Sequence, residues 1–119
     1  GNFQAQLGLA LLNEKDKHYT EAYDGINSLI EQYPDSAMAY AARGGMEKER
    51  GMLELAEFDY AKAMELDASN EDFAFNHVDI LIQLGRKDEA YRDLKKLLDA
   101  GCQPGRLQNF YARLKKKKK

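Results

Sequence analysis

The sequence predicts an all-α protein built as a helical solenoid, and three observations support this prediction. Apolar residues recur at the spacing of amphipathic helices along most of the chain. No segment alternates polar and apolar residues as a half-buried strand would. The third observation is a repeat of 34 residues, in which Ala56 has counterparts in Ala22 and Ala90, and Gly51 recurs as Gly85. A repeat of this length is typical of stacked helix pairs.

The helix expected at Leu53–Asp67 lies at the centre of this pattern. We expect its apolar face to consist of four large residues with small ones between them: Leu55, Phe58, Met64 and Leu66, with Ala56, Ala61 and Ala63. Alanines on a helix face allow a neighbouring helix to approach closely, so this face is expected to pack against the adjacent units.

Seven helices joined by short turns are expected. They span Phe3–Leu12, Thr20–Gln32, Ala37–Arg50, Leu53–Asp67, Phe73–Leu84 and Asp88–Ala100, and the last begins at Pro104. Pro34 drives the residue before it out of the helical region and so ends the second helix. Ser36 and Asn70 are suitable N-cap residues, and Gly51 is a suitable residue to follow a helix C-terminus.

Composition and charge limit the classes of function. The 119 residues carry a formal charge of −2, but five of the 18 basic residues form the terminal run Lys115–Lys119. The remaining 13 basic residues against 20 acidic ones give the rest of the chain a charge of about −7, which disfavours nucleic-acid binding by the folded part. We expect the lysine run to be a disordered, solvated end. The alternative is electrostatic attachment to acidic lipid or nucleic acid.

The cellular compartment is indicated only by small clues. Cys102 is the only cysteine, so it forms no internal disulfide, and this favours a reducing compartment such as the cytoplasm. No apolar run is long enough for a transmembrane helix, and a soluble protein is expected. The chain begins at Gly1 without a methionine; we interpret it as a processed product, an interpretation that allows for a removed targeting segment.

The units resemble the tetratricopeptide repeat (TPR), whose signature is W-x-x-L-G-x-x-Y, then A-x-x-x-F, then P. The middle unit matches it with Tyr40-x-x-Arg43-Gly44-x-x-Glu47, Ala56-x-x-x-Tyr60 and Ala68. The last unit matches it with Ala74-x-x-His77-Val78-x-x-Leu81, Ala90-x-x-x-Leu94 and Cys102. Arg43 and Glu47 replace an expected Leu and Tyr, and an i, i+4 ion pair between them is expected.

The first unit fits the signature in two ways. With two extra residues in the turn Asn13–Tyr19, Leu7-Gly8 occupies the paired Leu-Gly places; without them, Leu9-Ala10 does. We favour the insertion. The resemblance then implies one domain over residues 1–114, with repeats at about 1–36, 37–70 and 71–103 and a capping helix at 104–114. It also implies a right-handed superhelix with a concave face.

No pattern indicates catalysis or cofactor binding. The sequence contains no nucleophile elbow, phosphate-cradling loop or zinc motif, and we expect neither an enzyme nor a cofactor or metal. His18 lies in a charged turn, and His77 has no ligand-type neighbour at i+4, so both are interpreted as surface or packing residues. No small-molecule substrate is expected.

The resemblance implies that the first helix of each pair lines a groove for a peptide or partner segment. In the second and third units this groove would carry Met38, Ala41, Ala42, Gly45, Lys48, Glu49, Asp72, Phe75, Asn76, Asp79, Ile82 and Gln83. In the favoured register the first unit adds Ala5, Gln6, Leu9 and Leu12. The Lys, Asn and Arg clamp with which some family members hold a C-terminal carboxylate is absent, because its places are taken by Ala5, Leu9, Ala42, Asp72 and Asn76.

These features predict a non-catalytic scaffold that binds another protein. Phe75 is the only aromatic residue of the predicted groove, and Asp72 and Asp79 flank it at one-turn spacing. We therefore expect a partner segment with an apolar anchor and basic flanks. Two alternatives remain open: a structural subunit that forms homo-oligomers, and a module tethered to membrane or nucleic acid through Lys115–Lys119.

Overall fold

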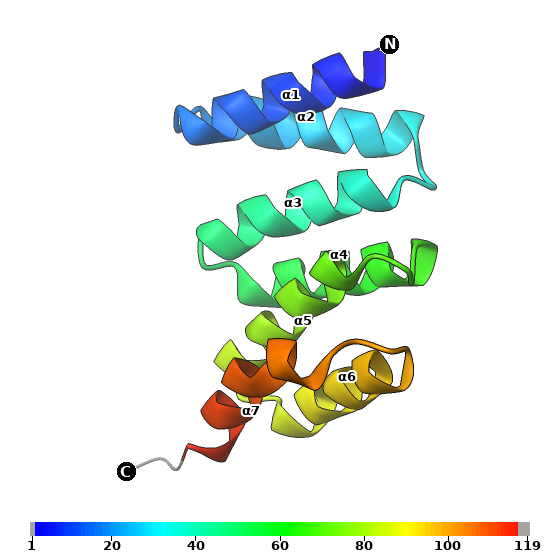
Figure 1. The fold of residues 1–119 in the computed structure, drawn as a ribbon. Coiled ribbons are helices and arrows are strands. Elements are labelled where there is room, and N and C mark those ends of the chain that lie inside the picture. The colour runs from blue at the N-terminus through cyan, green and yellow to red at the C-terminus, as the bar shows by residue number, and fades with distance from the viewer. Residues whose placement is uncertain (1, 117–119) are drawn as a thin grey trace.

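The computed structural model describes residues 2–116, which form a stack of antiparallel helix pairs (Figure 1). The first pair is α1 (Asn2–Lys15) and α2 (Tyr19–Gln32), and the second is α3 (Ala37–Glu49) and α4 (Leu53–Leu66). The third pair is α5 (Glu71–Gln83) and α6 (Lys87–Asp99), followed by a 3-10 turn (Pro104–Leu107) and α7 (Gln108–Lys115). The all-α solenoid predicted from the sequence is thus confirmed. Residues 117–119 of the lysine run lie outside the described residues.

The ends of the helices follow the local chemistry. The Ser36 hydroxyl accepts a hydrogen bond from the Ala39 amide at 3.1 Å, and the Asn70 side chain accepts one from the Asp72 amide at 2.9 Å. These are the expected N-caps of α3 and α5, and they satisfy amide groups that the helices leave unpaired. The last helix differs from the prediction, because Pro104 opens a 3-10 turn and the α-helix begins only at Gln108.

The turns inside the three pairs reveal the register of the first unit. Gly51 and Gly85 both have a φ of 77°, and Lys17, 34 residues before Gly51, has a φ of 65°. This left-handed conformation usually requires glycine, so the three turns have the same geometry. The favoured two-residue insertion in the first unit is therefore wrong. The 34-residue period holds from the first turn onward, with Lys17 at the glycine place.

Small residues at the predicted period lie where helices cross. Ala22, Ala56 and Ala90 are each 0% exposed and belong to the three hydrophobic clusters of the molecule. One cluster joins α1, α2 and α3, the second lies between α3, α4 and α5, and the third joins α5, α6 and α7. Each pair thus completes its core with its neighbour, as a solenoid requires.

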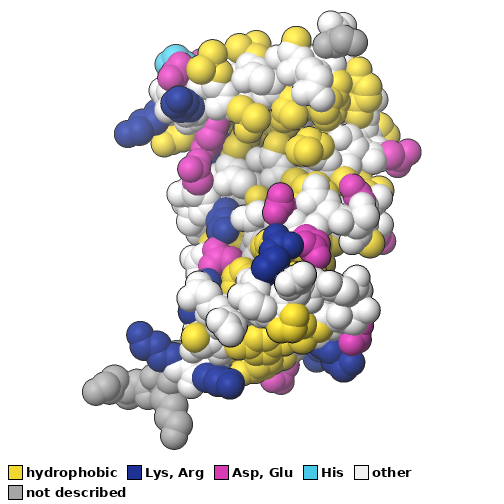
Figure 2. Space-filling model, viewed as in Figure 1, with side chains coloured by type: hydrophobic (Ala, Val, Ile, Leu, Met, Phe, Trp, Pro, Cys, Tyr) yellow, Lys and Arg dark blue, Asp and Glu magenta, His cyan; other side chains and the backbone are white. Residues whose placement is uncertain are grey.

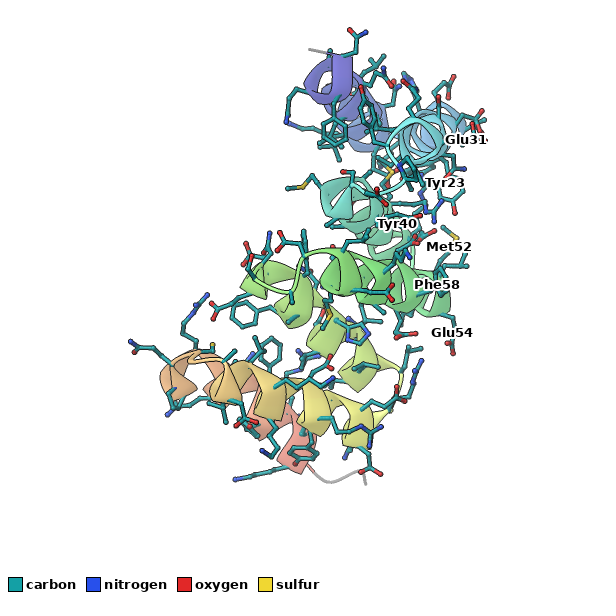
Figure 3. All side chains as sticks on the ribbon, turned by 90° about the vertical axis from the view of Figure 1, so that its right-hand side faces the viewer. Tyr23, Glu31, Tyr40, Met52, Glu54 and Phe58 are labelled. Atoms are coloured by element: carbon teal, nitrogen blue, oxygen red, sulfur yellow. The ribbon has the colours of Figure 1, made fainter. Side chains whose placement is uncertain are left out.

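Some large apolar side chains that were expected in buried helix faces lie on the surface instead. Hydrophobic side chains gather over the upper part of the molecule in Figure 2, whereas basic and acidic ones lie side by side at mid-height. The face predicted for α4 is wrong at two positions, since Leu55 is 52% and Phe58 63% exposed. Phe58 lies on the outer side of α4 in Figure 3. The buried face is instead formed by Ala56, Asp59, Tyr60 and Ala63.

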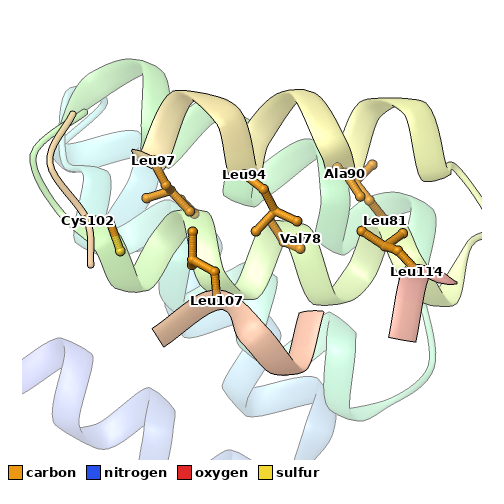
Figure 4. Packing of buried hydrophobic residues seen from close by; sticks show 9 residues of the cluster. Val78, Leu81, Ala90, Leu94, Leu97, Cys102, Leu107 and Leu114 are labelled. Atoms are coloured by element: carbon orange, nitrogen blue, oxygen red, sulfur yellow. The ribbon is translucent and has the colours of Figure 1, made fainter. Parts of the chain in front are cut away.

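The C-terminal segment covers the last helix pair, as expected of a cap. Leu107 and Leu114 are 0% and 3% exposed and pack with Val78 and Leu94 in one cluster (Figure 4). The Tyr111 ring lies 6.0 Å from the ring of Tyr91. The 3-10 turn and α7 therefore shield apolar surface of α5 and α6 that would otherwise face water.

Candidate functional site

A groove runs across the first helices of the three pairs. It has a volume of about 710 Å³ and is lined from α1, α3 and α5, with one residue contributed by α4. The lining residues are Leu11, Glu14, Lys15, Ala41, Ala42, Gly45, Met46, Lys48, Glu49, Tyr60, Asn76 and Gln83. No helix among residues 2–116 is long and apolar enough to cross a membrane. A hollow of similar volume, about 720 Å³, lies among α4, α5 and α6. The groove differs from it in that it is lined from the first helices of all three pairs.

The floor of the groove is formed by small residues of α3. Ala41 is buried, and Ala42 and Gly45 are half-buried, so only methyl groups and a hydrogen atom project from this part of the helix. Tyr60 reaches the floor from α4. A Cβ atom at Gly44 would lie 2.8 Å from the Tyr60 ring, and one at Gly45 would lie 3.3 Å from its hydroxyl oxygen. The two glycines thus let Tyr60 pack directly against the helix backbone.

One rim of the groove is an ion-pair network. Lys48 Nζ donates to Asp79 at 2.8 Å and to Asn76 Oδ1 at 3.0 Å, and Arg113 of α7 donates to the other Asp79 oxygen at 2.7 Å. Burial alone would raise the pKa of Asp79, but the hydrogen bonds from Lys48 and Arg113 outweigh it and lower the pKa. Because two cations already neutralise Asp79, this carboxylate is poorly placed to attract a basic partner.

The structure divides the predicted groove residues into two groups. Seven of the twelve line the groove together: Ala41, Ala42, Gly45, Lys48, Glu49, Asn76 and Gln83. Asp79 lies at the rim, bound to Lys48. The other four lie elsewhere. Met38 is exposed near the start of α3, and Asp72 lines a separate depression beside Arg106. Phe75 and Ile82 pack against the core of the last pair.

Phe75 is covered rather than open. Its ring centroid lies 6.1 Å from that of Phe110, and the Arg106 guanidinium lies over it at 4.7 Å. Both partners belong to the C-terminal segment. An aromatic ring held in this way contributes to the packing of the cap, and the anchor role expected for Phe75 is not supported by its position.

Sequence reasoning missed the groove residues of the first unit and Tyr60. Leu11, Glu14 and Lys15 line the groove, whereas Gln6 and Leu9 face a depression against α2. The signal was available, because Leu11, Glu14 and Lys15 precede Gly45, Lys48 and Glu49 by 34 residues each. Tyr60 gave no such signal, since it lies on a second helix of a pair and reaches the groove only because Gly44 and Gly45 lack side chains.

Comparison with known proteins identifies the fold. No family model matches the sequence, and no curated protein matches it. Among solved structures, the chain is similar to the TPR domain of OM64 from Arabidopsis, with a TM-score of 0.80 and 22% identity over 96% of this chain and 94% of that one. The chain has the tetratricopeptide-repeat fold.

A second solved TPR-like neighbour was determined with a peptide. It is the Yersinia enterocolitica type III secretion chaperone SycD, in complex with a peptide of the translocator YopD. Its TM-score is 0.76 at 18% identity, and the match covers 95% of this chain and 86% of that one. At these identities the similarity establishes the fold alone.

Behind the groove, a buried polar cluster joins the first two TPR units. Arg43 of α3 donates two hydrogen bonds of 2.8 Å to Asp59 of α4 and one of 2.9 Å to Asn27 of α2. Glu47 accepts a hydrogen bond of 2.7 Å from the Tyr23 hydroxyl. The predicted pair of Arg43 with Glu47 is present only at 4.0 Å, so Asp59 is the main partner of Arg43.

Glu47 is held in an environment that favours its neutral form. Its side chain is 1% exposed, and its Oε1 atom is fully buried without a hydrogen-bond partner among the described residues. Burial, followed by the nearby Asp59 carboxylate, raises the pKa of Glu47 to about 8, although Tyr23 and Arg43 oppose the shift. The folded protein therefore retains a proton on Glu47 at neutral pH.

We expect the stability of the protein to fall as the pH rises from 4.5 to about 8. In this window Glu47 is protonated in the folded state and ionised in the unfolded state, since its ordinary pKa is 4.5 and its folded pKa about 8. Glu47→Gln cannot ionise. It should raise the free energy of unfolding at pH 8 by about 1–3 kcal/mol and flatten its pH dependence. Urea unfolding at several pH values measures both effects.

The matched control is Glu49→Gln, two residues along α3 at an exposed position. This variant should keep the pH dependence of the parent. A Glu47→Gln variant whose stability runs parallel to that of the parent across the same pH range would contradict the assignment of the proton to Glu47.

A second buried polar cluster joins the second and third TPR units. His77 of α5 is 7% exposed and makes hydrogen bonds to Asp93 of α6 through Nδ1 and to Glu57 of α4 through Nε2, the latter at 2.8 Å. Burial lowers the pKa of His77, but the two carboxylates outweigh it and raise the pKa. No group of three metal-binding side chains is present among residues 2–116. Through these two hydrogen bonds His77 links α4, α5 and α6, which is a packing role.

Proposed function

We propose that this protein is a non-catalytic TPR interaction module that holds an extended segment of another protein in the groove across α1, α3 and α5. The main support is the groove floor formed by Ala41, Ala42 and Gly45, which offers space and apolar contact because no large side chain fills it. Concave sites of this kind bind ligands largely by apolar contact with a few oriented polar groups.

The peptide complex of SycD supports the proposal, since a protein with this fold holds a peptide of its partner. The chemistry of the groove favours a segment with small or aliphatic residues at its centre. Asp79 is neutralised by Lys48 and Arg113, and Glu14 is paired with Arg50, so the basic character expected for the partner depends on the exposed Glu49 alone.

Filling the groove tests the proposal. A library of random twelve-residue peptides displayed on phage is selected on the full chain, and the best binder is synthesised as the probe. Ala42→Phe places a ring on the groove floor and should weaken probe binding by at least about tenfold, as expected when a buried contact of 1.4 kcal/mol or more is lost. Ala112→Phe, an exposed alanine of α7, is the matched control and should bind as the parent does.

Two outcomes would overturn the proposal: a library that yields no binder, or a probe that binds Ala42→Phe as tightly as the parent. Circular dichroism melting of both variants verifies that they fold. If the variants fold, either of the two outcomes excludes the groove as the binding surface.

Self-association is the second candidate function, and α1 provides the observation that favours it. Leu9 and Leu12 are 60% and 53% exposed and lie one turn apart on this first helix, and exposed apolar residues that lie together mark interaction sites. Sedimentation at several concentrations distinguishes the candidates. A mass that stays that of one chain across the concentration range excludes self-association and leaves the groove proposal intact.

A further inference from the structure

The Tyr60 hydroxyl is a hydrogen-bond donor without a partner. The side chain is 6% exposed, yet among the described residues the hydroxyl makes no hydrogen bond, in contrast to the Tyr23 hydroxyl, which donates to Glu47 at 2.7 Å. Tyr60 lines the groove, and its oxygen retains access to solvent, because Glu47 Oε1 is the only fully buried side-chain atom of the described chain that lacks a partner. The hydroxyl is therefore free to donate a hydrogen bond to a ligand that enters the groove.

The surroundings of this hydroxyl determine what can reach it. Gly45 leaves the oxygen uncovered, since a Cβ atom there would stand 3.3 Å from it. Ala41 and Ala42 beside it project only methyl groups. Since no large side chain covers the floor, the main chain of a ligand can come within hydrogen-bond range of the hydroxyl, and its carbonyl group can serve as the acceptor.

The charges near the hydroxyl favour a neutral acceptor. Lys48, the nearest cation of the floor helix that lines the groove, is already bound to Asp79 and Asn76. Glu49, the next residue of the same helix, is exposed, and its carboxylate would repel an acidic ligand group. Burial raises the pKa of Tyr60, so its hydroxyl remains a protonated donor at neutral pH.

We propose that the Tyr60 hydroxyl donates a hydrogen bond to a main-chain carbonyl of an extended peptide lying across Ala41, Ala42 and Gly45. This inference rests on the proposed groove function and deepens it. The peptide residue that faces Gly45 must be small, such as glycine, alanine or serine, because the carbonyl reaches the hydroxyl only if the ligand backbone comes close to the floor. The hydroxyl thus fixes the register of the ligand, and the two glycines of α3 make this contact available.

Tyr60→Phe tests the hydrogen bond while it keeps the ring that packs on Gly44. With the phage-selected peptide as the probe, we expect its dissociation constant to rise about three- to tenfold, the usual effect of one lost hydrogen bond. The melting temperature should stay close to that of the parent, since the hydroxyl has no partner within the described chain. Tyr91→Phe, on α6 at 38% exposure, is the matched control and should leave both quantities unchanged.

Backbone ester scanning locates the acceptor. Each amide of the probe is replaced in turn by an ester, whose carbonyl is a weaker acceptor. One ester should weaken binding to the parent and lose this effect with Tyr60→Phe. Gly45→Ala, which places a methyl group against the hydroxyl, should weaken the unmodified probe as well.

The results separate this inference from the groove function. If Ala42→Phe blocks the probe but Tyr60→Phe binds it as tightly as the parent, the hydrogen bond is overturned and the groove function stands. Should no ester show a Tyr60-dependent effect, the main-chain carbonyl is excluded as the acceptor. A probe that Ala42→Phe does not affect overturns the groove function, and the inference with it.

Discussion

Replacing Arg43 by methionine is expected to destabilise the protein by about 3–5 kcal/mol, because it leaves the Asp59 carboxylate buried without its cation. Asp59 is 2% exposed, and both of its oxygens accept hydrogen bonds of 2.8 Å from Arg43. The same guanidinium also binds Asn27 and lies 5.6 Å from the Tyr40 ring. One substitution therefore releases contacts among α2, α3 and α4. The free energy of unfolding in urea, compared with that of the parent, measures the effect.

The double variant Arg43→Met/Asp59→Leu is the informative control. Replacing both members of a buried ion pair by apolar residues of similar volume is often neutral or stabilising, whereas removing one member is costly. We therefore expect the double variant to recover most of the stability lost in Arg43→Met. An Arg43→Met variant whose stability lies within about 1 kcal/mol of the parent would show that burial of Asp59 does not depend on Arg43.

The architecture could be predicted from the sequence because small residues at a fixed period record where helices cross. Ala22, Ala56 and Ala90 are all 0% exposed, and the turns after α1, α3 and α5 share one backbone geometry. Close helix packing cannot accept larger side chains at such crossings, so the period survives even where the large signature residues have changed. The register of the first unit was mistaken because Lys17 stands where the other units have glycine.

The buried face of α4 could not be predicted from hydrophobicity. Leu55 and Phe58 are exposed while Asp59 is buried, the reverse of what their side chains suggest alone. Asp59 can be buried because Arg43 of the preceding helix reaches it, and Glu47 because it holds a proton. Both reasons are tertiary, since each depends on a group that packing brings close from a distant part of the chain.

The candidate groove was predictable in outline, from the rule that the first helix of each pair lines it. The period places Ala41, Ala42 and Gly45 of α3 on the floor, and they lie there. The position of Phe75 could not be predicted in the same way, because it depends on the path of the chain after α6. Since Arg106 and Phe110 return to cover Phe75, a residue that fits the repeat pattern of the groove became part of the cap.

Removing residues 104–119 is expected to destabilise the last helix pair by at least about 3–6 kcal/mol, since burial of a leucine side chain contributes about 1.5–3 kcal/mol and two leucines are lost. Leu107 and Leu114 are 0% and 3% exposed and cover Val78 and Leu94. The truncation also removes Arg113, one of the two cations that bind Asp79. We expect a lower melting temperature, increased binding of a hydrophobic dye and aggregation at high protein concentration.

A shorter truncation separates the cap from the lysine run. Removing residues 115–119 leaves the buried leucines and Arg113 in place, and the two described residues of that run, Lys115 and Lys116, are exposed. This variant should melt at the temperature of the parent and bind no additional dye. If both truncations behave like the parent, the core of α5 and α6 is complete without α7, and the C-terminal segment does not act as a cap. If both lose stability equally, the lysine run itself contributes, and the loss should then diminish in high salt because exposed charges are screened.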